Sequence, residues 1–253
     1  MNARINIPEI VLVGKKGSNK TSFLESFLGT AILPIDKPSV TRRPMFFQII
    51  QNTSCKKPRI TIRRDTKFVE FANDQEIDRE ELPLYLEKRN LTCNEPIYVN
   101  YEYEFAWNMI LIDTPGFLKE ESDGVTPEQR EQLLTELCKE PKRLILSVEK
   151  AREEGGSENL DFLKSVDPRL DRTIFIFDSV LEILKSFSSG GGTSNLNRFM
   201  TSSPRPNTSF WTDVVSGDAR SLYTGEDELF REKIEQLIEN ENKLFEQLKY
   251  DMR

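Results

Sequence analysis

The sequence predicts an α/β fold in which a mostly parallel sheet carries helices on both of its faces. Apolar segments of strand length alternate along the chain with amphipathic segments of helix length, as such folds require. Two of the apolar segments, 10–13 and 107–112, run directly into turns that contain glycine and polar residues. In open α/β sheets, ligands bind outside the carboxyl ends of the strands, so these two turns are the first candidates for a site.

The elements follow from local patterns. The strand at 10–13 leads into a helix at 20–28, and 97–105 alternates apolar and polar residues like a half-exposed antiparallel strand. Thr126 and Pro127 predict the start of a helix that runs to Cys138. The apolar face of the helix at 20–28, which core packing explains, consists of Phe23, Leu24, Phe27 and Leu28. The other predicted elements are strands at 45–50, 59–71, 144–148, 173–177 and 210–215, helices at 81–89, 160–166, 180–187 and 226–252, and a polar loop at 188–203.

The turn after the first strand has the spacing of a phosphate-binding loop. Gly14 is followed by four residues and then by Asn19-Lys20-Thr21, which fits the pattern G-x4-G-K-[ST] except at Asn19. In this interpretation Lys20 reaches the terminal phosphates and the Thr21 hydroxyl binds Mg²⁺, while backbone amides face the polyphosphate. The alternative is a strand-to-helix turn with an incidental lysine. The predicted nucleotide-binding residues of the loop are Gly14, Lys15, Lys16, Gly17, Ser18, Asn19, Lys20, Thr21 and Ser22.

A second turn supports the interpretation of the first as a phosphate-binding loop. The apolar strand at 107–112 runs into Asp113-Thr114-Pro115-Gly116. In nucleoside triphosphatases an aspartate at this place binds Mg²⁺ through water, and a glycine three residues later can bring its amide to the γ-phosphate. The alternative is a proline-glycine turn with an N-capping aspartate. Both turns together indicate a P-loop nucleoside triphosphatase, with Asp113 and Gly116 in the site.

Composition fits this class and excludes others. The 253 residues suffice for one sizeable core, and we interpret 1–253 as one domain that begins almost on its first strand, as an excised domain would. A net charge of −7 argues against nucleic acid as a partner. The absence of histidine excludes His-based general bases and histidine metal ligands, so any hydrolysis must use a positioned water. Three cysteines without paired spacing indicate a reducing compartment, and no signal peptide or membrane span is evident.

Between the two turns lies Ser39-Val40-Thr41-Arg42-Arg43-Pro44, preceded by Ile32-Leu33-Pro34. Together with both turns, these residues resemble the GTPase (G) domain of the dynamin superfamily. The resemblance implies that Thr41 closes over the γ-phosphate and Mg²⁺. The candidate catalytic residues are Thr41, Lys20 and Lys16. It also implies GTP and GDP as ligands, assembly through G domains as a homodimer or hetero-assembly, and membrane contact through a stalk that these residues lack. A solvated basic turn is the alternative for the segment alone.

A narrower resemblance covers the rest of the chain. Segments 166–174 and 209–217, the serine-rich insertion between them and the long closing helix at 226–253 are similar to those of plastid-division dynamin-related proteins. This resemblance implies a mechanochemical protein of organelle division that acts at the cytosolic face of an organelle outer membrane.

The chain departs from the family pattern where the base is recognised. After the strand at 173–177 the family carries Thr-Lys-x-Asp, and this chain has Asp178-Ser179-Val180-Leu181. The missing lysine and aspartate predict weaker selection of guanine over adenine. Asp178 and Ser179 remain candidate nucleotide-binding residues, with helix N-capping as the alternative for Asp178, and the loop at Ser216-Gly217 is another candidate.

The phosphate-binding loop departs at two places. Asn19 stands where glycine is expected, and asparagine is the least costly replacement if the position needs a positive φ. Lys15-Lys16-Gly17 stands where dynamins usually have Gly-Gln-Ser. Lys16 can supply the positive charge that the family takes from a bound monovalent cation, or it is a solvated loop lysine. Three hypotheses therefore stay open: a GTPase, a non-catalytic partner of an active dynamin, and an enzyme that accepts ATP or several nucleotides.

Overall fold

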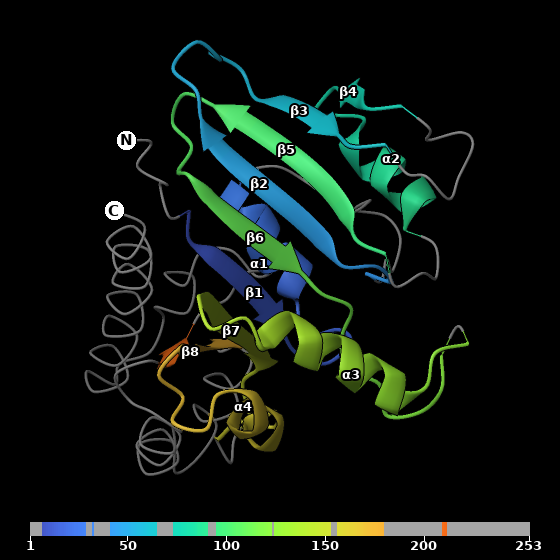
Figure 1. The fold of residues 1–253 in the computed structure, drawn as a ribbon, viewed down its shortest axis with the longest axis vertical. Coiled ribbons are helices and arrows are strands. Elements are labelled where there is room, and N and C mark those ends of the chain that lie inside the picture. The colour runs from blue at the N-terminus through green and yellow to red at the C-terminus, as the bar shows by residue number, and fades with distance from the viewer. Residues whose placement is uncertain are drawn as a thin grey trace, which may run out of the picture. The chain divides into compact units, whose positions relative to one another are not determined.

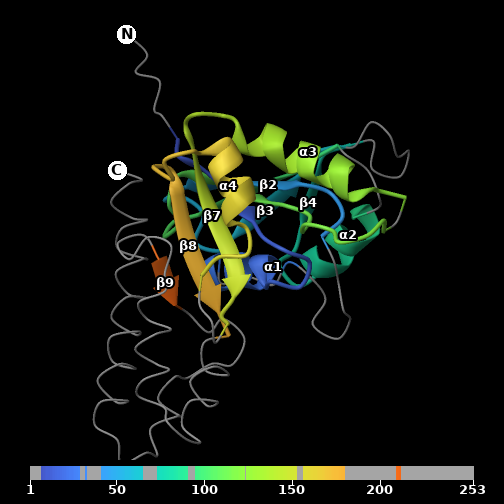
Figure 2. The same ribbon diagram turned by 90° about the horizontal axis from the view of Figure 1, so that it is seen from below.

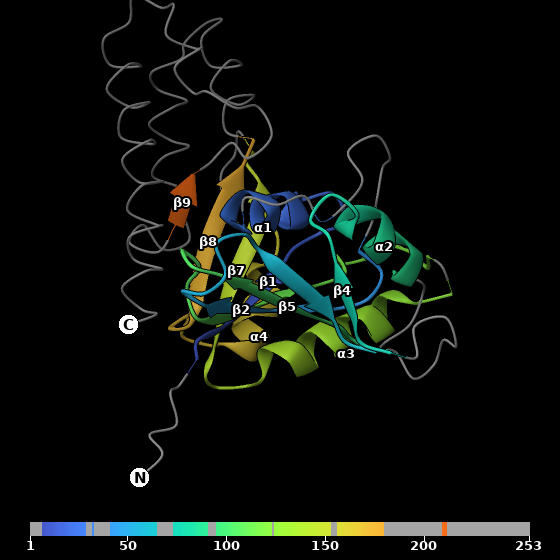
Figure 3. The same ribbon diagram turned by 90° about the horizontal axis from the view of Figure 1, so that it is seen from above.

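The computed structural model, shown in Figures 1, 2 and 3, describes residues 7–28, 32, 41–64, 73–90, 95–122, 124–152, 156–179 and 209–211. The chain divides into two compact units, the first running through Ile145 and the second beginning at Leu146. The assignment of 1–253 to one domain stays a prediction.

The first unit contains most of the strands. Their order across the sheet is β4-β3-β5-β2-β6-β1. Its elements are β1 (Glu9–Val13), α1 (Lys20–Leu28), β2 (Met45–Gln51), β3 (Arg59–Ile62), β4 (Gln75–Ile77), α2 (Leu82–Arg89), β5 (Ile97–Tyr103), β6 (Met109–Asp113) and α3 (Pro127–Cys138). In the described part of the second unit lie β7 (Arg143–Lys150), which crosses the boundary, α4 (Leu160–Val166), β8 (Thr173–Asp178) and β9 (Ser209–Trp211).

The sheet of the first unit mixes both strand directions. β1 pairs with β6, and β2 with β5, in parallel, while β2 pairs with β6 and β3 with β4 and β5 in antiparallel. In the second unit β8 and β9 are parallel. Helices α1 and α3 lie on opposite faces of the sheet, as Figures 2 and 3 show from opposite sides. The predicted α/β class with helices on both faces is confirmed.

The strands that carry the two glycine-containing turns are almost fully buried. In β1 the four residues Ile10–Val13 are at most 1% exposed, and most of β6 is equally enclosed, because helices cover both faces of this part of the sheet. On β5 the burial alternates as predicted, with Ile97 and Val99 inward and Tyr98 exposed. Phe23 and Leu24 of α1 are buried, Leu28 is half-buried, and the side chain of Phe27 lies outside the described part.

Several predicted elements agree with the structure to the residue. The helix at 20–28 is α1, the helix at 160–166 is α4, and α3 spans the predicted 127–138. Thr126 caps α3 through a capping box in which its hydroxyl accepts from Gln129 N while the Gln129 side chain accepts from Thr126 N.

Other predicted strands are shorter in the structure. The strand predicted at 59–71 ends at Ile62, because the Asp74 carboxylate accepts from Arg64 N and diverts that amide from the sheet. The strand predicted at 107–112 begins at Met109, because the Asn108 side chain takes the amide of Gln51. β5 ends at Tyr103 in a turn closed by Ala106 N and Tyr103 O.

Strand β4 was not predicted, since three residues are too few for a periodic pattern. The last strand, predicted at 210–215, is described only at Ser209–Trp211. The predicted helices at 180–187 and 226–252 and the loop at 188–203 lie outside the described residues. No helix in the described part of the chain is long and apolar enough to cross a membrane.

Candidate nucleotide-binding site

The loop between β1 and α1 contains two residues with a positive φ. Gly17 has a φ of +79°, and Asn19 has a φ of +61°. Asparagine is among the few residues that tolerate the left-handed region, so the departure from glycine at Asn19 is accommodated. The remaining loop residues differ in exposure: Gly14 and Ser18 are buried, Lys15, Asn19 and Ser22 are half-buried, and Lys16 and Gly17 are exposed.

Lys20 is the lysine of the loop that points inward. Its Nζ donates to the carbonyl oxygens of Gly14 at 3.1 Å and Lys15 at 2.9 Å, and the side chain is 6% exposed. Burial lowers the pKa of Lys20 to about 8, a shift that Asp113 opposes and the nearby cation of Arg130 reinforces. A buried ammonium beneath a loop of backbone amides provides a place for a polyanion.

Asp113 gathers two hydroxyl groups from distant parts of the sequence. Its Oδ2 accepts from Thr21 Oγ1 at 2.8 Å and from Thr41 Oγ1 at 2.9 Å, and the two hydroxyl oxygens lie 3.0 Å apart. Thr41 is 7% exposed and Asp113 is fully buried. Burial raises the pKa of Asp113, against the opposing effects of Lys20 and of both threonine hydrogen bonds. The structure therefore brings the three predicted metal ligands together.

The strand register explains this meeting. Asp113 is the last residue of β6, where it pairs with Leu12 of β1 on one side and with Met45 of β2 on the other. The loop and α1 follow directly after β1, and Thr41 lies four residues before Met45. Three chain segments thus end at the same edge of the sheet, which is where α/β folds place their ligands.

The donor set of this cluster fits Mg²⁺. Two hydroxyls and one carboxylate are hard oxygen ligands, and Asp113 Oδ1 is buried without a hydrogen-bond partner. An unpaired buried carboxylate oxygen is costly unless a cation takes it up. Clusters of three or more His, Cys, Asp or Glu side chains are absent from the described residues.

Gly116 lies against the backbone of the loop. A Cβ atom at Gly116 would approach Lys16 N to 2.4 Å and the Lys15 carbonyl carbon to 2.7 Å. Phe117 N donates to Gly14 O at 3.0 Å, and Lys16 N donates to Phe117 O at 3.4 Å. Glycine is therefore required here by contact with the loop, a reason that the motif alone did not give. Its predicted contact with the γ-phosphate stays a prediction.

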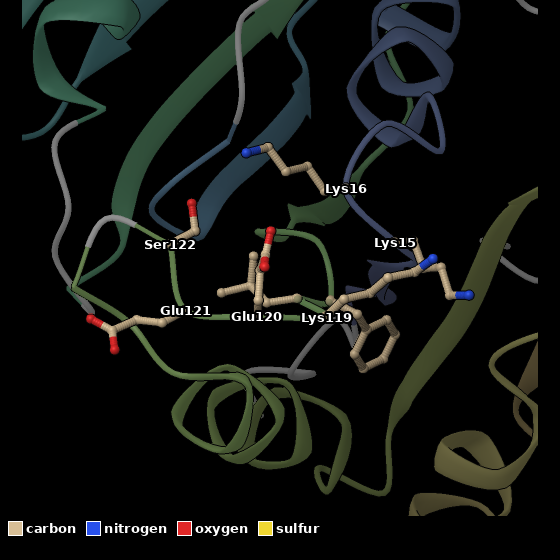
Figure 4. Close-up of a pocket in the computed structure, with 8 residues that line it drawn as sticks. Lys15, Lys16, Lys119, Glu120, Glu121 and Ser122 are labelled. Atoms are coloured by element: carbon tan, nitrogen blue, oxygen red, sulfur yellow. The ribbon is translucent and has the colours of Figure 1, made fainter.

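A cavity of about 400 Å³ opens beside the loop. Lys15 and Lys16 form one wall, and residues 117–122 form the other. In Figure 4 the side chains of Lys15 and Lys16 leave the loop in different directions, while Lys119 and Glu120 come from the opposite segment. The volume is within the range of small-ligand pockets.

A family model described as "Dynamin family" matches residues 10–180, which include both turns and the segment with Thr41. The chain belongs to the dynamin family. Dynamin-like protein A of Dictyostelium discoideum is 30% identical over the whole chain, which covers 30% of that protein. Dynamin-like protein B of the same organism is 26% identical, again over the whole chain and over 34% of the relative. Dynamin-related protein 5A of Arabidopsis thaliana is 27% identical over 79% of the chain and 26% of its own length. The chain therefore spans about a third of the length of these relatives.

In the second unit of this dynamin-family chain, the last residue of β8 and the residue after it are buried. Asp178 is fully buried, and its Oδ2 accepts from Ser179 Oγ at 3.2 Å. Ser179 has a φ of +61° and is 9% exposed. Ser216 and Gly217, the other candidate base-reading residues, lie outside the described part, and so does the helix that Asp178 was predicted to cap.

Three residues near the site were not predicted from the sequence. Arg130 of α3 is 7% exposed and acts electrostatically on Lys20. Arg43 and Asn90 hold the segment that carries Thr41, as described below. No motif marks Arg130 or Asn90, because their places depend on how α3 and α2 pack in the first unit.

Proposed function

We propose that the chain binds and hydrolyses GTP as the G domain of a dynamin-related mechanochemical protein. The observation that carries this proposal is the cluster of Thr21, Thr41 and Asp113 next to the buried Lys20. Membership of the dynamin family adds the expectation that the nucleotide is GTP and the product GDP.

The residues of the site have separate roles in this proposal. The Lys20 ammonium neutralises charge on the terminal phosphates, and the oxygens of Thr21, Thr41 and Asp113 hold Mg²⁺. A bound Mg²⁺ supplies positive charge that stabilises the negative charge growing on the phosphoryl oxygens. Lys16, exposed on the wall of the cavity, adds a tethered positive charge near the bridge between the β- and γ-phosphates.

Two observations favour a second candidate, a degenerate G domain that co-assembles with an active dynamin or accepts several nucleotides. Asp178, which stands three positions before the place of the family's base-reading aspartate, is fully buried and accepts a hydrogen bond from Ser179. The loop carries Lys15-Lys16-Gly17 in place of the residues that usually orient water and cation. A buried carboxylate already engaged by a neighbour is poorly placed to select guanine.

We further propose the cellular setting from the resemblance of the second half of the sequence to plastid-division dynamins. The protein assembles through its G domain as a homodimer or with another dynamin, and acts at the cytosolic face of an organelle, a plastid, during its division. Fluorescence imaging of the tagged full-length protein tests this setting. A ring at the constriction of dividing plastids supports it, and a location on another membrane contradicts it.

The enzymatic proposal is tested by calorimetric titration of the chain with GTP, ATP and a non-hydrolysable GTP analogue in Mg²⁺, followed by measurement of phosphate release. Binding together with phosphate release from GTP supports the GTPase. Binding without release favours the non-catalytic partner. Absence of any binding contradicts both candidates.

A further inference from the structure

The segment that carries Thr41 is held at two ends. At one end the Thr41 hydroxyl donates to Asp113 Oδ2 at 2.9 Å, so the threonine is already placed against the metal cluster. At the other end Pro44 O accepts from Ile97 N at 2.8 Å, where β2 and β5 begin their parallel pairing. The two residues between these ends, Arg42 and Arg43, decide whether the backbone of Thr41 stays in place.

A single side chain holds the backbone of both arginines. Asn90 Oδ1 accepts from Arg42 N at 2.7 Å and from Arg43 N at 3.2 Å. Asn90 is 6% exposed, and its hydrogen bond with Arg43 N is buried while that with Arg42 N is partly buried.

The Arg43 side chain adds a second fastening to the same place. Its Nε donates to Glu95 O at 2.8 Å and its Nη1 donates to Arg89 O at 3.1 Å, and the residue is 1% exposed. Arg89 ends α2, and Asn90 caps it with its own amide bonded to Leu86 O and Glu87 O. A cation at the carbonyl end of a helix is stabilised by the helix dipole and satisfies an otherwise open carbonyl.

We propose that Arg43 and Asn90 form a latch that ties the Thr41 segment to the end of α2, and that they are positioning residues for Thr41. The inference rests on the proposed function, since Thr41 matters only if the site handles a nucleoside triphosphate. Neither residue contacts the cluster by a hydrogen bond of its own. The latch acts through the backbone of residues 42 and 43, so the end of α2 sets where the Thr41 hydroxyl stands relative to Asp113.

The first test compares Asn90→Ala with Asn90→Asp. Alanine removes the acceptor of both amides, and misplacing Thr41 should lower kcat for Mg²⁺-GTP roughly tenfold or more. Affinity for GDP, which has no γ-phosphate for Thr41 to contact, should change less than about twofold. Aspartate keeps the acceptor oxygen, so Asn90→Asp should return kcat to within about threefold of the wild type.

Three outcomes of this comparison overturn the latch. They are an unchanged kcat in Asn90→Ala, an equal loss of kcat and of GDP affinity, and a failure of Asn90→Asp to recover. If Asn90→Ala does not fold, Arg43→Lys takes its place. It keeps the charge but replaces the two separate donor atoms of the guanidinium, Nε to Glu95 O and Nη1 to Arg89 O, by a single ammonium nitrogen, and the same separation of kcat from GDP affinity is expected.

A second readout needs no catalysis. Amide hydrogen exchange of the wild-type chain without nucleotide should show protection at Arg42 and Arg43, which Asn90→Ala loses while the amide of Phe23 in α1 stays protected. Exchange of both arginine amides at the rate of an open chain in the wild type overturns the latch. If the wild type hydrolyses no GTP but both amides are protected, the proposed function fails and the latch stands.

Discussion

At the scale of single residues, the structure places charges where they cost stability. Lys20 is buried with its ammonium on backbone carbonyls, and Asp113 is buried with one oxygen unpaired. In the proposed function each group is stabilised by a ligand of opposite charge, Lys20 by phosphate and Asp113 by a cation. Local costs of this kind are expected at functional sites and are offset by packing elsewhere.

The lowered pKa of Lys20 makes stability depend on pH. Below pH 8 the folded and unfolded chains both carry the ammonium, so this residue causes no pH dependence. Between pH 8 and 10.5 the folded chain has lost the proton that the unfolded chain keeps, so the free energy of unfolding rises with pH. A pKa that falls from 10.5 to about 8 corresponds to about 3 kcal/mol, at about 1.4 kcal/mol per unit.

Lys20→Met isolates this effect. Urea unfolding from pH 7 to 10.5 should show the wild type gaining about 3 kcal/mol relative to the variant, all of it above pH 8. Titrating groups beyond the reach of Lys20 are common to both chains and cancel in the difference, whereas Asp113, whose pKa Lys20 lowers, does not. Parallel curves for the two chains would show that Lys20 keeps its ordinary pKa, and hence that its ammonium is not desolvated in the folded chain.

Substitution of Lys16 tests whether this lysine or a bound monovalent cation supplies the positive charge near the β- and γ-phosphates. If its ammonium stands near the bridge of the β- and γ-phosphates, GTP hydrolysis should not depend on K⁺ as opposed to a bulky inert cation. Lys16→Gln should slow hydrolysis about 10- to 100-fold, and Lys119→Gln, across the same cavity, serves as the matched control with little expected effect. A wild-type rate that requires K⁺, with Lys16→Gln harmless, assigns this lysine to solvent.

At the scale of elements, the close packing of two turns sets the shape of the loop. Gly116 leaves no room for a side chain against Lys15 and Lys16, and the neighbouring Phe117 bonds to Gly14. Because the obstructing atoms are backbone rather than the ends of long side chains, the loop itself must move to admit a Cβ atom.

Gly116→Ala should therefore weaken GTP binding about tenfold or more in calorimetry, while circular dichroism shows the fold retained. Gly124→Ala is the matched control: its φ of +72° costs about 1 kcal/mol, but its Cβ atom would meet nothing within 4 Å. Its nucleotide affinity should equal that of the wild type. Equal effects of the two substitutions on affinity would refute the packing explanation.

The elements also show what the sequence could and could not predict. Helix α3 was predictable at both ends, because its capping residues Thr126 and Pro127 are local. The end of β3 was not, because it depends on a hydrogen bond from Arg64 to Asp74, ten residues away. Within the site, motif spacing identified Thr21 and Asp113. Asn90 could not be identified in this way, because it lies 48 residues from Arg42, whose amide it binds only in the folded chain.

At the scale of the whole molecule, each of the two compact units carries a separate part of the family's sequence pattern. The predicted phosphate and metal ligands belong to the first unit, while the end of β8 and the residues after it, where the family carries its base-reading motif, belong to the second. Asp178 is buried at this place, which favours weak selection of the base. Because other residues would bind the phosphates, phosphate binding can persist when base selection is weak.

We expect the chain to show a reduced preference for GTP over ATP, because a site that lacks hydrogen-bond partners for a base loses up to about 10⁴-fold in selectivity. Competition titrations with GTP and ATP in Mg²⁺ measure this ratio directly. Submillimolar GTP binding with no detectable ATP binding would contradict the expectation, and would direct attention to the loop at Ser216-Gly217 as the segment that reads the base.

The most direct test of the phosphate-binding site is calorimetric titration of Mg²⁺-GTP into the wild type and Lys20→Ala. Lys20 should contribute charge-assisted hydrogen bonds to the terminal phosphates, each worth about 1.5–3 kcal/mol. The account predicts saturable binding by the wild type and affinity at least about tenfold lower in Lys20→Ala, with both chains equally folded. Equal affinity in the two chains would contradict it, because the loop would then bind nucleotide without its buried lysine or not at all.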